Sequence, residues 1–337
     1  MTTRLVIRTE NLTRDFASVR ALDQLTLEVE MGTIFGFLGP NGAGKTTTIR
    51  LLLGLLEPTA GSAEVLGHDT RRQPDAIRAE CGALLEHTGL YERLTAMDNL
   101  GFYARVWRLS AAEREARIRE LLTHLDLWER RTESVSGWSR GTKQKLALAR
   151  TLLHRPALVF LDEPTGGLDP VAAAALRDDL ASLAAREGTT VFLTTHNLSE
   201  AEKLCDRVAV IRAGKLIAVG PPDQLRVGEP GLVIVCNGIS EVALAALRAC
   251  PEVGSVVVGD GRLAITLTGD TPAAPLVATL VAHGVAIEEV VRQRASLEEA
   301  FLALVEEEPA RSRTSRPSCG RNGASISCNT AAWSSGC

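Results

Sequence analysis

The sequence predicts an α/β fold in which a mostly parallel sheet carries a phosphate-binding turn. Strand-like and helix-like stretches alternate from residue 1 to about residue 220, as expected where helices connect parallel strands. A glycine-rich stretch at 39–44 stands between one such strand and one such helix. A continuous apolar run at 157–161 ends directly in two carboxylates, Asp162 and Glu163.

Length and composition indicate a globular chain of about two domains. The chain has 337 residues, of which 45% are apolar and 23% are charged. The net charge of −4 and the 4% of aromatic residues do not favour a nucleic-acid partner. No apolar run approaches 18 residues and no apolar signal core follows the first residue, so we expect neither a membrane span nor a leader. The seven cysteines form no Cys-x-x-Cys pair, which argues against a zinc or redox site and fits a reduced compartment.

The elements of the first part follow from local signals. Residues 33–38 predict a buried strand, and residues 46 to about 56 predict a helix. Ser110 and Glu113 form a capping box, and apolar residues at helical spacing continue the helix that it begins. Asp169 followed by Pro170 predicts the start of another helix, which ends near residue 188. Further strands of the same sheet are expected at 157–161, 189–194 and 207–211.

A second, smaller unit follows a boundary at Gly220-Pro221-Pro222. Its order is strand, helix, strand, strand, helix, strand, which is typical of the ferredoxin-like α+β fold. The strands are expected at 232–236, 253–258, 263–267 and 286–291, and the helices at 241–249 and 272–283. We therefore expect domains at 1–222 and 223–308, the second being a stabilising or dimerising module or an accessory to the first. The Ser- and Arg-rich tail at 309–337 is either disordered or an artefact of the sequence.

The glycine-rich stretch matches the phosphate-binding pattern G-x-x-x-x-G-K-[ST]. Glycines allow backbone N–H groups to surround phosphate oxygens, and the positive end of the following helix faces the same anion. Lys45 adds a charge for the β- and γ-phosphates, and the Thr46 hydroxyl is a candidate Mg²⁺ ligand. The flanking strand and helix argue against a chance glycine turn. The candidate nucleotide-binding residues are Gly39, Pro40, Asn41, Gly42, Ala43, Gly44, Lys45, Thr46 and Thr47.

Asp162 and Glu163 end a predicted central strand, at the edge where open α/β sheets bind ligands. Asp162 is suited to orient Mg²⁺ through its water shell, and Glu163 to act as general base on an attacking water. Two solvated acids at a strand end are the alternative, which the phosphate-binding turn on the same sheet disfavours. His196 ends a further strand and is a candidate γ-phosphate ligand and catalytic residue beside Lys45 and Glu163. An ordinary histidine at a helix start is the alternative for His196.

The segment from residue 138 to residue 150 resembles the signature of the ABC transporter ATPase family. Ser139 and Gly141 match the usual Leu-Ser-Gly-Gly-Gln pattern, whereas Arg140 replaces a glycine and Thr142 replaces the glutamine. The resemblance covers residues 5 to about 220 and implies a P-loop NTPase core with a helical subdomain at about 88–155. It also implies that Ser139 and Gly141 bind the nucleotide held by a second copy of the chain. A basic amphipathic helix start is the alternative for this segment alone.

Three further positions acquire roles only from this resemblance. Phe16 stands where the family has an aromatic ring that stacks on adenine, with a core residue of an edge strand as the alternative. Asp169 belongs to a loop that communicates across the dimer, in addition to capping a helix. Glu86 replaces the usual glutamine in the loop that leads into the helical subdomain. We expect Glu86 to act at the metal with altered Mg²⁺ affinity; a solvated loop acid is the alternative.

Residues 220–225 and 295–301 narrow the resemblance to ATPase subunits of type-2 exporters, of the daunorubicin and multidrug resistance kind. Such a subunit binds ATP and Mg²⁺, works as a homodimer, and powers a separate transmembrane permease from the cytoplasmic face of the membrane. The expected cargo is a drug, an antibiotic or another hydrophobic compound. The alternative is an ABC-type ATPase of DNA repair, translation or cluster assembly, which the single core and the lack of a coiled-coil insertion disfavour. A permease is expected to contact the region from 86 to 103, with a local core as the alternative; the candidate contacts are Tyr91, Leu94, Phe102 and Tyr103.

Overall fold

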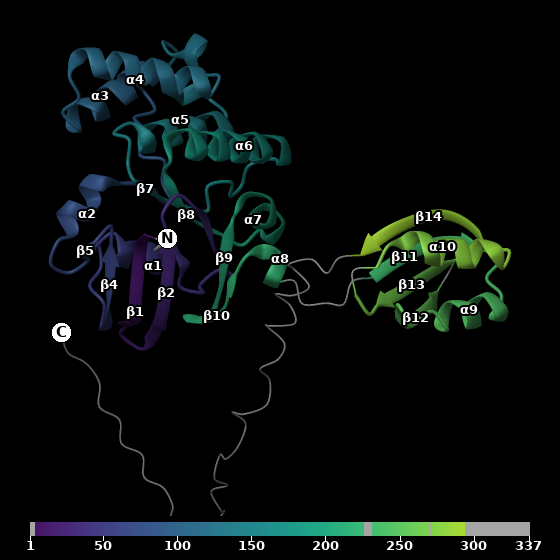
Figure 1. Ribbon diagram of the computed structural model, residues 1–337. Coiled ribbons are helices and arrows are strands. Elements are labelled where there is room, and N and C mark those ends of the chain that lie inside the picture. The colour runs from purple at the N-terminus through teal and green to yellow at the C-terminus, as the bar shows by residue number, and fades with distance from the viewer. Residues whose placement is uncertain (1–3, 226–230, 260, 270, 294–337) are drawn as a thin grey trace, which may run out of the picture.

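The computed structural model describes residues 4–225, 231–259, 261–269 and 271–293. These residues form an N-terminal part with two sheets and a C-terminal part with a third (Figure 1). The boundary expected at 220–222 falls just before the undescribed residues 226–230. The motif at 295–301 and the tail at 309–337 lie outside the described residues.

A six-stranded sheet with the strand order β10-β9-β3-β8-β7-β6 forms the centre of the N-terminal part. Neighbouring strands from β9 to β6 run parallel, and β10 joins the edge antiparallel to β9. Because β8 pairs with both β3 and β7, the carboxyl ends of these three strands meet at one edge of the sheet. The strands are β3 (Ile34–Leu38), β6 (Cys81–Leu84), β7 (Leu158–Asp162), β8 (Thr190–Thr195), β9 (Arg207–Arg212) and β10 (Lys215–Gly220).

One face of this sheet packs against α1 (Lys45–Leu52) and an antiparallel sheet. Side chains alternate across a strand, so Phe35, Phe37, Phe160 and Phe192 all reach this face. The Phe192 ring lies 5.5, 5.6 and 5.7 Å from the other three ring centroids. The antiparallel sheet, in the order β2-β1-β4-β5, consists of β1 (Leu5–Phe16), β2 (Val19–Glu30), β4 (Ala60–Val65) and β5 (His68–Asp69), with α2 (Pro74–Glu80) after it.

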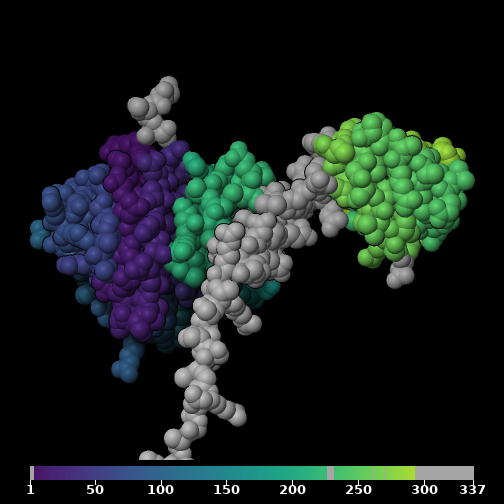
Figure 2. Space-filling model, turned by 90° about the horizontal axis from the view of Figure 1, so that it is seen from below, coloured from purple at the N-terminus to yellow at the C-terminus, as the bar shows by residue number. Residues whose placement is uncertain are grey.

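The space-filling view shows how the antiparallel strands lie beside the central sheet. The purple surface of β1 and β2 stands between the blue surface of the β4 and β5 region and the teal-to-green surface that follows β8 (Figure 2). The Asp23 amide of β2 donates to the Gly214 carbonyl, 2.9 Å away, in the turn between β9 and β10. The two sheets are therefore joined through β2 and β10 as well as through their shared core.

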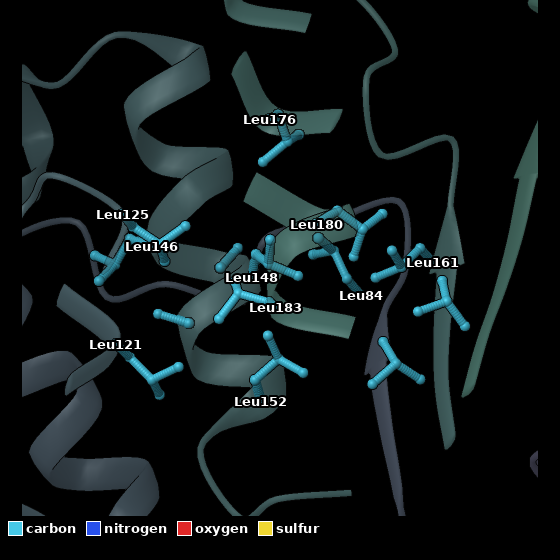
Figure 3. Close-up of a cluster of buried hydrophobic side chains, with 14 of the residues drawn as sticks. Leu84, Leu121, Leu125, Leu146, Leu148, Leu152, Leu161, Leu176, Leu180 and Leu183 are labelled. Atoms are coloured by element: carbon cyan, nitrogen blue, oxygen red, sulfur yellow. The ribbon is translucent and has the colours of Figure 1, made fainter. Parts of the chain in front are cut away.

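The other face of the central sheet is covered by helices joined through leucines (Figure 3). Leucines of α4, α5 and α6 point toward one another and toward Leu84 and Leu161 of the sheet. The capping box predicted at Ser110 and Glu113 is confirmed, with both of its hydrogen bonds present. The helical elements are α3 (Ala96–Val106), α4 (Ala111–His124), η1 (Trp128–Arg130), η2 (Val135–Gly137), α5 (Arg140–Leu152), α6 (Pro170–Glu187), α7 (Leu198–Leu204) and α8 (Pro222–Leu225).

The predicted end of α1 is wrong by about one turn, because α1 stops at Leu52 rather than near residue 56. The amides of Gly54 and Leu55 bond back to the carbonyls of Leu51 and Arg50. Such a closing turn satisfies the last helix carbonyls and redirects the chain. The apolar residues that extended the predicted helix belong instead to the connection before β4.

The C-terminal part has the ferredoxin-like order that the sequence predicts. Its four strands lie in the order β12-β13-β11-β14, and every neighbouring pair is antiparallel. Apolar side chains of α9 and α10 form a core with alternate residues of β11 and β13. The elements are β11 (Gly231–Asn237), α9 (Glu241–Arg248), β12 (Val253–Gly259), β13 (Arg262–Leu267), α10 (Ala273–Ala282) and β14 (Ala286–Gln293). The predicted fold class, a P-loop core with a small α+β domain, is confirmed.

A partly buried histidine, His154, is expected to make the stability of the N-terminal part depend on pH. The His154 ring stacks on Trp107 with 3.7 Å between ring centroids, and its Nε2 atom lies 3.1 Å from the Cys81 carbonyl oxygen. Burial lowers the pKa of His154 from 6.5 to about 4. Between these values the unfolded chain binds the additional proton, so the free energy of unfolding decreases as pH falls through this window.

We expect His154→Gln to make the free energy of unfolding depend less steeply on pH, as measured by urea titrations at pH 4 to 7. The exposed His87, changed to Gln, is the control that should leave the slope unaltered. If the free energy of unfolding of His154→Gln depends on pH as steeply as that of the unsubstituted chain, His154 is not the source of the pH dependence.

Candidate active site

A cavity of about 270 Å³ opens at the sheet edge where β3 and β7 end. Its lining combines most of the predicted phosphate-binding residues with the two predicted acids of β7 and with Glu86. One residue that the sequence did not indicate, Ala21 of β2, completes the wall. The lining residues are Ala21, Asn41, Gly42, Gly44, Lys45, Thr46, Thr47, Glu86, Asp162 and Glu163.

The turn before α1 presents the start of the helix to this cavity. Gly44 precedes α1 with φ of 109°, and a Cβ atom there would lie 2.5 Å from the Ala21 carbonyl oxygen. Only glycine combines that backbone angle with so close an approach. The first turn of α1 contains no acidic residue. Backbone N–H groups and the positive end of the helix are therefore available to an anion in the cavity.

Three of the nine predicted residues of the phosphate-binding turn do not line the cavity. Ala43 is buried, and its amide donates to the Pro40 carbonyl at 3.2 Å. Gly39 packs against β9, where a Cβ atom would lie 2.4 Å from the Ile211 carbonyl oxygen. Gly39, Pro40 and Ala43 therefore shape the turn, while the neighbouring residues face the cavity.

Lys45, Glu163 and His196 form a continuous chain of polar contacts. The Lys45 ammonium group is buried and donates to the Gly39 carbonyl at 2.7 Å and to the Pro40 carbonyl at 3.3 Å. It also lies 3.0 Å from Glu163 Oε1, and Glu163 Oε2 lies 2.7 Å from His196 Nδ1. Because a carboxylate only accepts hydrogen bonds, His196 Nδ1 carries the proton. The three predicted catalytic residues thus share one network.

Asp162 is held with both carboxylate oxygens occupied. The Thr46 hydroxyl donates to Oδ2 at 2.7 Å, and the Thr194 hydroxyl donates to Oδ1 at 2.6 Å. Thr194 stands opposite Asp162 in the β7–β8 pairing. The sequence places Thr194 beside His196 but gives no signal that it orients the acid, because the contact depends on strand register.

Glu163 has a strained backbone that its surroundings maintain. Its φ is 50°, in the left-handed region that residues with a side chain rarely adopt. Its amide donates to the Thr194 carbonyl and to the Thr194 hydroxyl, each at 3.1 Å. Strain of this kind persists where several contacts fix it, and it concentrates at functional sites.

The oxygen atoms around the cavity fit a magnesium ion in their chemistry. Mg²⁺ prefers hard oxygen ligands and is commonly held by one or two carboxylates together with substrate phosphates. Thr46 and Asp162 supply such oxygens, and the exposed Glu86 lines the same cavity. In the part of the chain that the structure describes, no group of three or more His, Cys, Asp or Glu side chains is arranged to hold a metal.

The residues that the family resemblance adds lie elsewhere in the chain. Ser139 accepts from the Thr142 amide at the start of α5, and Asp169 accepts from the amides of Val171 and Ala172 at the start of α6. Gly141 brings these two helix starts together, since a Cβ atom there would lie 3.0 Å from the Ala172 methyl group. Ser139, Gly141 and Asp169 are absent from the lining of the phosphate cavity of their own chain.

Phe16 lies on the surface at the end of β1, with 40% of its area exposed. The Arg14 guanidinium covers its ring at 4.5 Å. This exposure argues against the core alternative for Phe16. Its role toward adenine stays a prediction.

A second cavity of about 420 Å³ lies on the far side of Glu163 and His196. Its wall includes the turn from Thr165 to Leu168 and the starts of α6 and α7. Glu163 therefore lines both cavities, and it is directly followed by the turn that forms the wall of the second.

An exposed aromatic cluster lies on α3 and the preceding loop. The rings of Tyr91 and Phe102 meet edge to face at 5.2 Å, and Tyr91, Leu94 and Phe102 are each at least 40% exposed. Tyr103 is partly buried against the helical core and donates to the Gly89 carbonyl. Tyr103 therefore belongs to a local core, whereas the exposed side chains of Tyr91, Leu94 and Phe102 do not.

Comparisons with known proteins agree with this geometry. The model of the ABC transporter family matches residues 22–166. A daunorubicin resistance ATP-binding protein of Streptomyces coeruleorubidus is 39% identical over 302 residues, which are 88% of this chain and 95% of that protein. A bacitracin transport ATP-binding protein of Bacillus licheniformis is 41% identical over 221 residues, 66% of this chain and 71% of that protein.

A solved structure described as the ATP-binding subunit of an ABC transporter also resembles the chain. It superposes with a TM-score of 0.59 at 32% identity, over 66% of this chain and 92% of that one. Of the helices that the structure describes, none has the length and apolar character needed to cross a bilayer.

Proposed function

The chain belongs to the ATP-binding proteins of ABC transporters, and on this premise we propose that it powers a drug or antibiotic exporter. It is an ATPase of that family. We propose further that two copies enclose two Mg·ATP and act on a separate transmembrane permease at the cytoplasmic face of the membrane. The observation that supports ATP hydrolysis is the Lys45–Glu163–His196 network at the wall of the phosphate cavity, and the export role is supported by the similarity to the daunorubicin resistance and bacitracin transport proteins.

In the proposed reaction, Glu163 accepts a proton from a water molecule while the water oxygen attacks the γ-phosphorus. The bond between the γ-phosphorus and the bridging oxygen breaks, and ADP leaves with that oxygen. Lys45 and His196 stabilise the negative charge that spreads over the transferred phosphoryl group. A Mg²⁺ ion held by Thr46 and Asp162 would supply further positive charge at the β- and γ-phosphates.

In this proposal the second copy completes each site with Ser139 and Gly141. These residues lie at the start of α5, whose N-terminal N–H groups suit a phosphate. Asp169 takes part in communication between the copies, and Phe16 stacks on adenine. The exposed cluster of Tyr91, Leu94 and Phe102 is the proposed permease contact.

The proposal is tested with the full chain produced together with a candidate permease, a membrane protein taken from a neighbouring reading frame. We expect the two to purify together and ATP hydrolysis to increase when a transported antibiotic is added. Double alanine substitution of Tyr91 and Phe102 should disrupt the complex, and the exposed Val281 of the C-terminal part, changed to Ala, is the control. Hydrolysis that is insensitive to the membrane protein and to any antibiotic would refute the role in export.

Glu86 provides a separate test of the metal site. We expect Glu86→Ala to raise the Mg²⁺ concentration needed for half-maximal ATP hydrolysis several-fold, because it removes a carboxylate from the cavity wall. Glu86→Gln keeps the size of the side chain and one oxygen, so its half-maximal Mg²⁺ concentration should lie between those of the unsubstituted chain and Glu86→Ala. The measurement is a Mg²⁺ titration of hydrolysis at fixed ATP. Unchanged activity and Mg²⁺ dependence in Glu86→Ala would make Glu86 a solvated loop acid.

A further inference from the structure

We propose that Arg140 is a positioning residue, which fixes the turn from Glu163 to Asp169 by packing its guanidinium against Gly167. This inference rests on the proposed ATPase mechanism, in which Glu163 is the general base. Arg140 stands where the sequence departs from the signature pattern, and neither the pattern nor the catalytic network gives it a role.

The contact between Arg140 and Gly167 is close. A Cβ atom on Gly167 would lie 2.3 Å from Arg140 Nη1, 2.7 Å from Cζ and 3.0 Å from Nη2. Gly167 has φ of 69°, which favours glycine. The backbone angle disfavours a side chain at 167, and any side chain there would have to displace the guanidinium of the exposed Arg140.

Neither helix stability nor ion pairing explains Arg140. It occupies the first turn of α5, where a cation opposes the helix dipole and where no acidic residue is present. The other two cations of this region have carboxylate partners, Lys143 with Glu92 at 3.0 Å and Lys145 with Asp179 at 2.8 Å. Among the described residues, no such ion pair involves Arg140. Its contact with Gly167 is thus the interaction that the structure assigns to its guanidinium.

The turn that Arg140 contacts begins at Glu163. The Gly166 amide donates to the Glu163 carbonyl at 2.9 Å, and the Leu168 amide donates to the Thr165 carbonyl at 3.1 Å. On the side of α7, the Thr165 hydroxyl donates to Glu200 at 2.5 Å. Arg140 contacts the turn from α5. The turn is therefore contacted by side chains of α7 and of α5, and Arg140 supplies the contact from α5.

Fixing this turn matters because Glu163 is strained. A residue with a side chain at φ of 50° stays there only while its neighbours hold it. Loosening the turn at Gly167 would allow Glu163 to relax and its carboxylate to leave its place between Lys45 and His196. Small displacements of a catalytic group cost rate rather than substrate binding.

The test combines exchange and kinetic measurements on the full chain. In Arg140→Ala we expect faster amide hydrogen exchange in the peptide that spans 163–169, and a kcat for ATP lower by about tenfold with KM changed less than twofold. Arg140→Lys should not restore kcat, because a compact ammonium group cannot replace the planar guanidinium. Lys143→Ala is the matched control, since it removes a cation one turn later that pairs with Glu92.

A double substitution tests the contact itself. Gly167→Ala inserts a Cβ where the guanidinium lies, so adding Arg140→Ala to it should cost little more than Gly167→Ala alone. The proposal is overturned if amide hydrogen exchange in 163–169 is unchanged in Arg140→Ala, or if Arg140→Lys restores kcat. It is also overturned if Arg140→Ala raises KM for ATP and leaves kcat unchanged. The last result would make Arg140 a nucleotide ligand. If the unsubstituted chain fails to hydrolyse ATP, the proposed mechanism fails, while the exchange result still decides whether Arg140 holds the turn.

Discussion

Replacing Glu163 with glutamine is expected to lower ATP turnover by about 100-fold or more while ATP binding is kept. The reason lies in the two contacts of the carboxylate. Glutamine has the same shape, so its carbonyl oxygen can lie beside the Lys45 ammonium group and its amide can donate to His196 once the ring presents an acceptor. The geometry of the network therefore survives, and only the ability to accept the proton of the attacking water is lost.

A chain that binds ATP without cleaving it should accumulate as the ATP-bound dimer. Size-exclusion chromatography with light scattering should show Glu163→Gln as a dimer with ATP and as a monomer with ADP. Glu115→Gln is the control, because Glu115 is an exposed carboxylate of α4 that does not line the phosphate cavity. A Glu163→Gln chain that hydrolyses ATP normally and stays monomeric with ATP would refute the mechanism.

The sequence was sufficient to predict the elements that depend on neighbouring residues. The turn at 39–46, the capping box at Ser110 and the cap at Asp169 are all encoded within four to eight residues. The signal for the strand end at Asp162 and Glu163 also lies in neighbouring residues, because a run of buried apolar residues is followed directly by two carboxylates. Such signals hold wherever the segment is packed, since they arise from backbone sterics and local hydrogen bonds.

The partners that complete the site could not be predicted in this way. Ala21 reaches Gly44 only because β2 lies beside the turn, and Thr194 meets Asp162 only because β8 pairs with β7 in one register. Arg140 lies 27 positions from Gly167 and is recognisable in the sequence only as a departure from a pattern. These contacts are set by how the elements pack, and no period or spacing in the sequence encodes them.

The largest expected loss of stability comes from Arg117, a buried cation that joins three helices. Its guanidinium, 3% exposed, donates to both carboxylate oxygens of Glu187, at 2.8 and 2.7 Å. It also donates to the carbonyls of Leu152 and Leu153 at the end of α5. Burial lowers the pKa of Arg117, but hydrogen bonds and charges of Glu187 and Glu120 raise it, and the pKa is raised overall. Arg117 therefore stays charged inside the helical layer.

Arg117→Ala should lower the free energy of unfolding by about 3–5 kcal/mol, because it removes the main counter-charge of the buried Glu187 carboxylate and leaves it only the partly exposed Arg186, 3.3 Å away. Urea unfolding followed by tryptophan fluorescence measures this directly, since Trp107, Trp128 and Trp138 all report on the helical region. Arg119→Ala, on the exposed face of the same helix, is the control and should cost less than about 1 kcal/mol.

A second variant distinguishes the effect of losing the charge of Arg117 from the effect of losing its side-chain volume. Arg117→Met combined with Glu187→Leu removes both charges and keeps most of the volume, and it should recover most of the loss. Recovery would mean that the buried Glu187 carboxylate without Arg117, and not the missing side-chain volume, accounts for the destabilisation of Arg117→Ala. If Arg117→Ala unfolds within about 1 kcal/mol of the unsubstituted chain, the helices are held by their leucines and the ion pair contributes little.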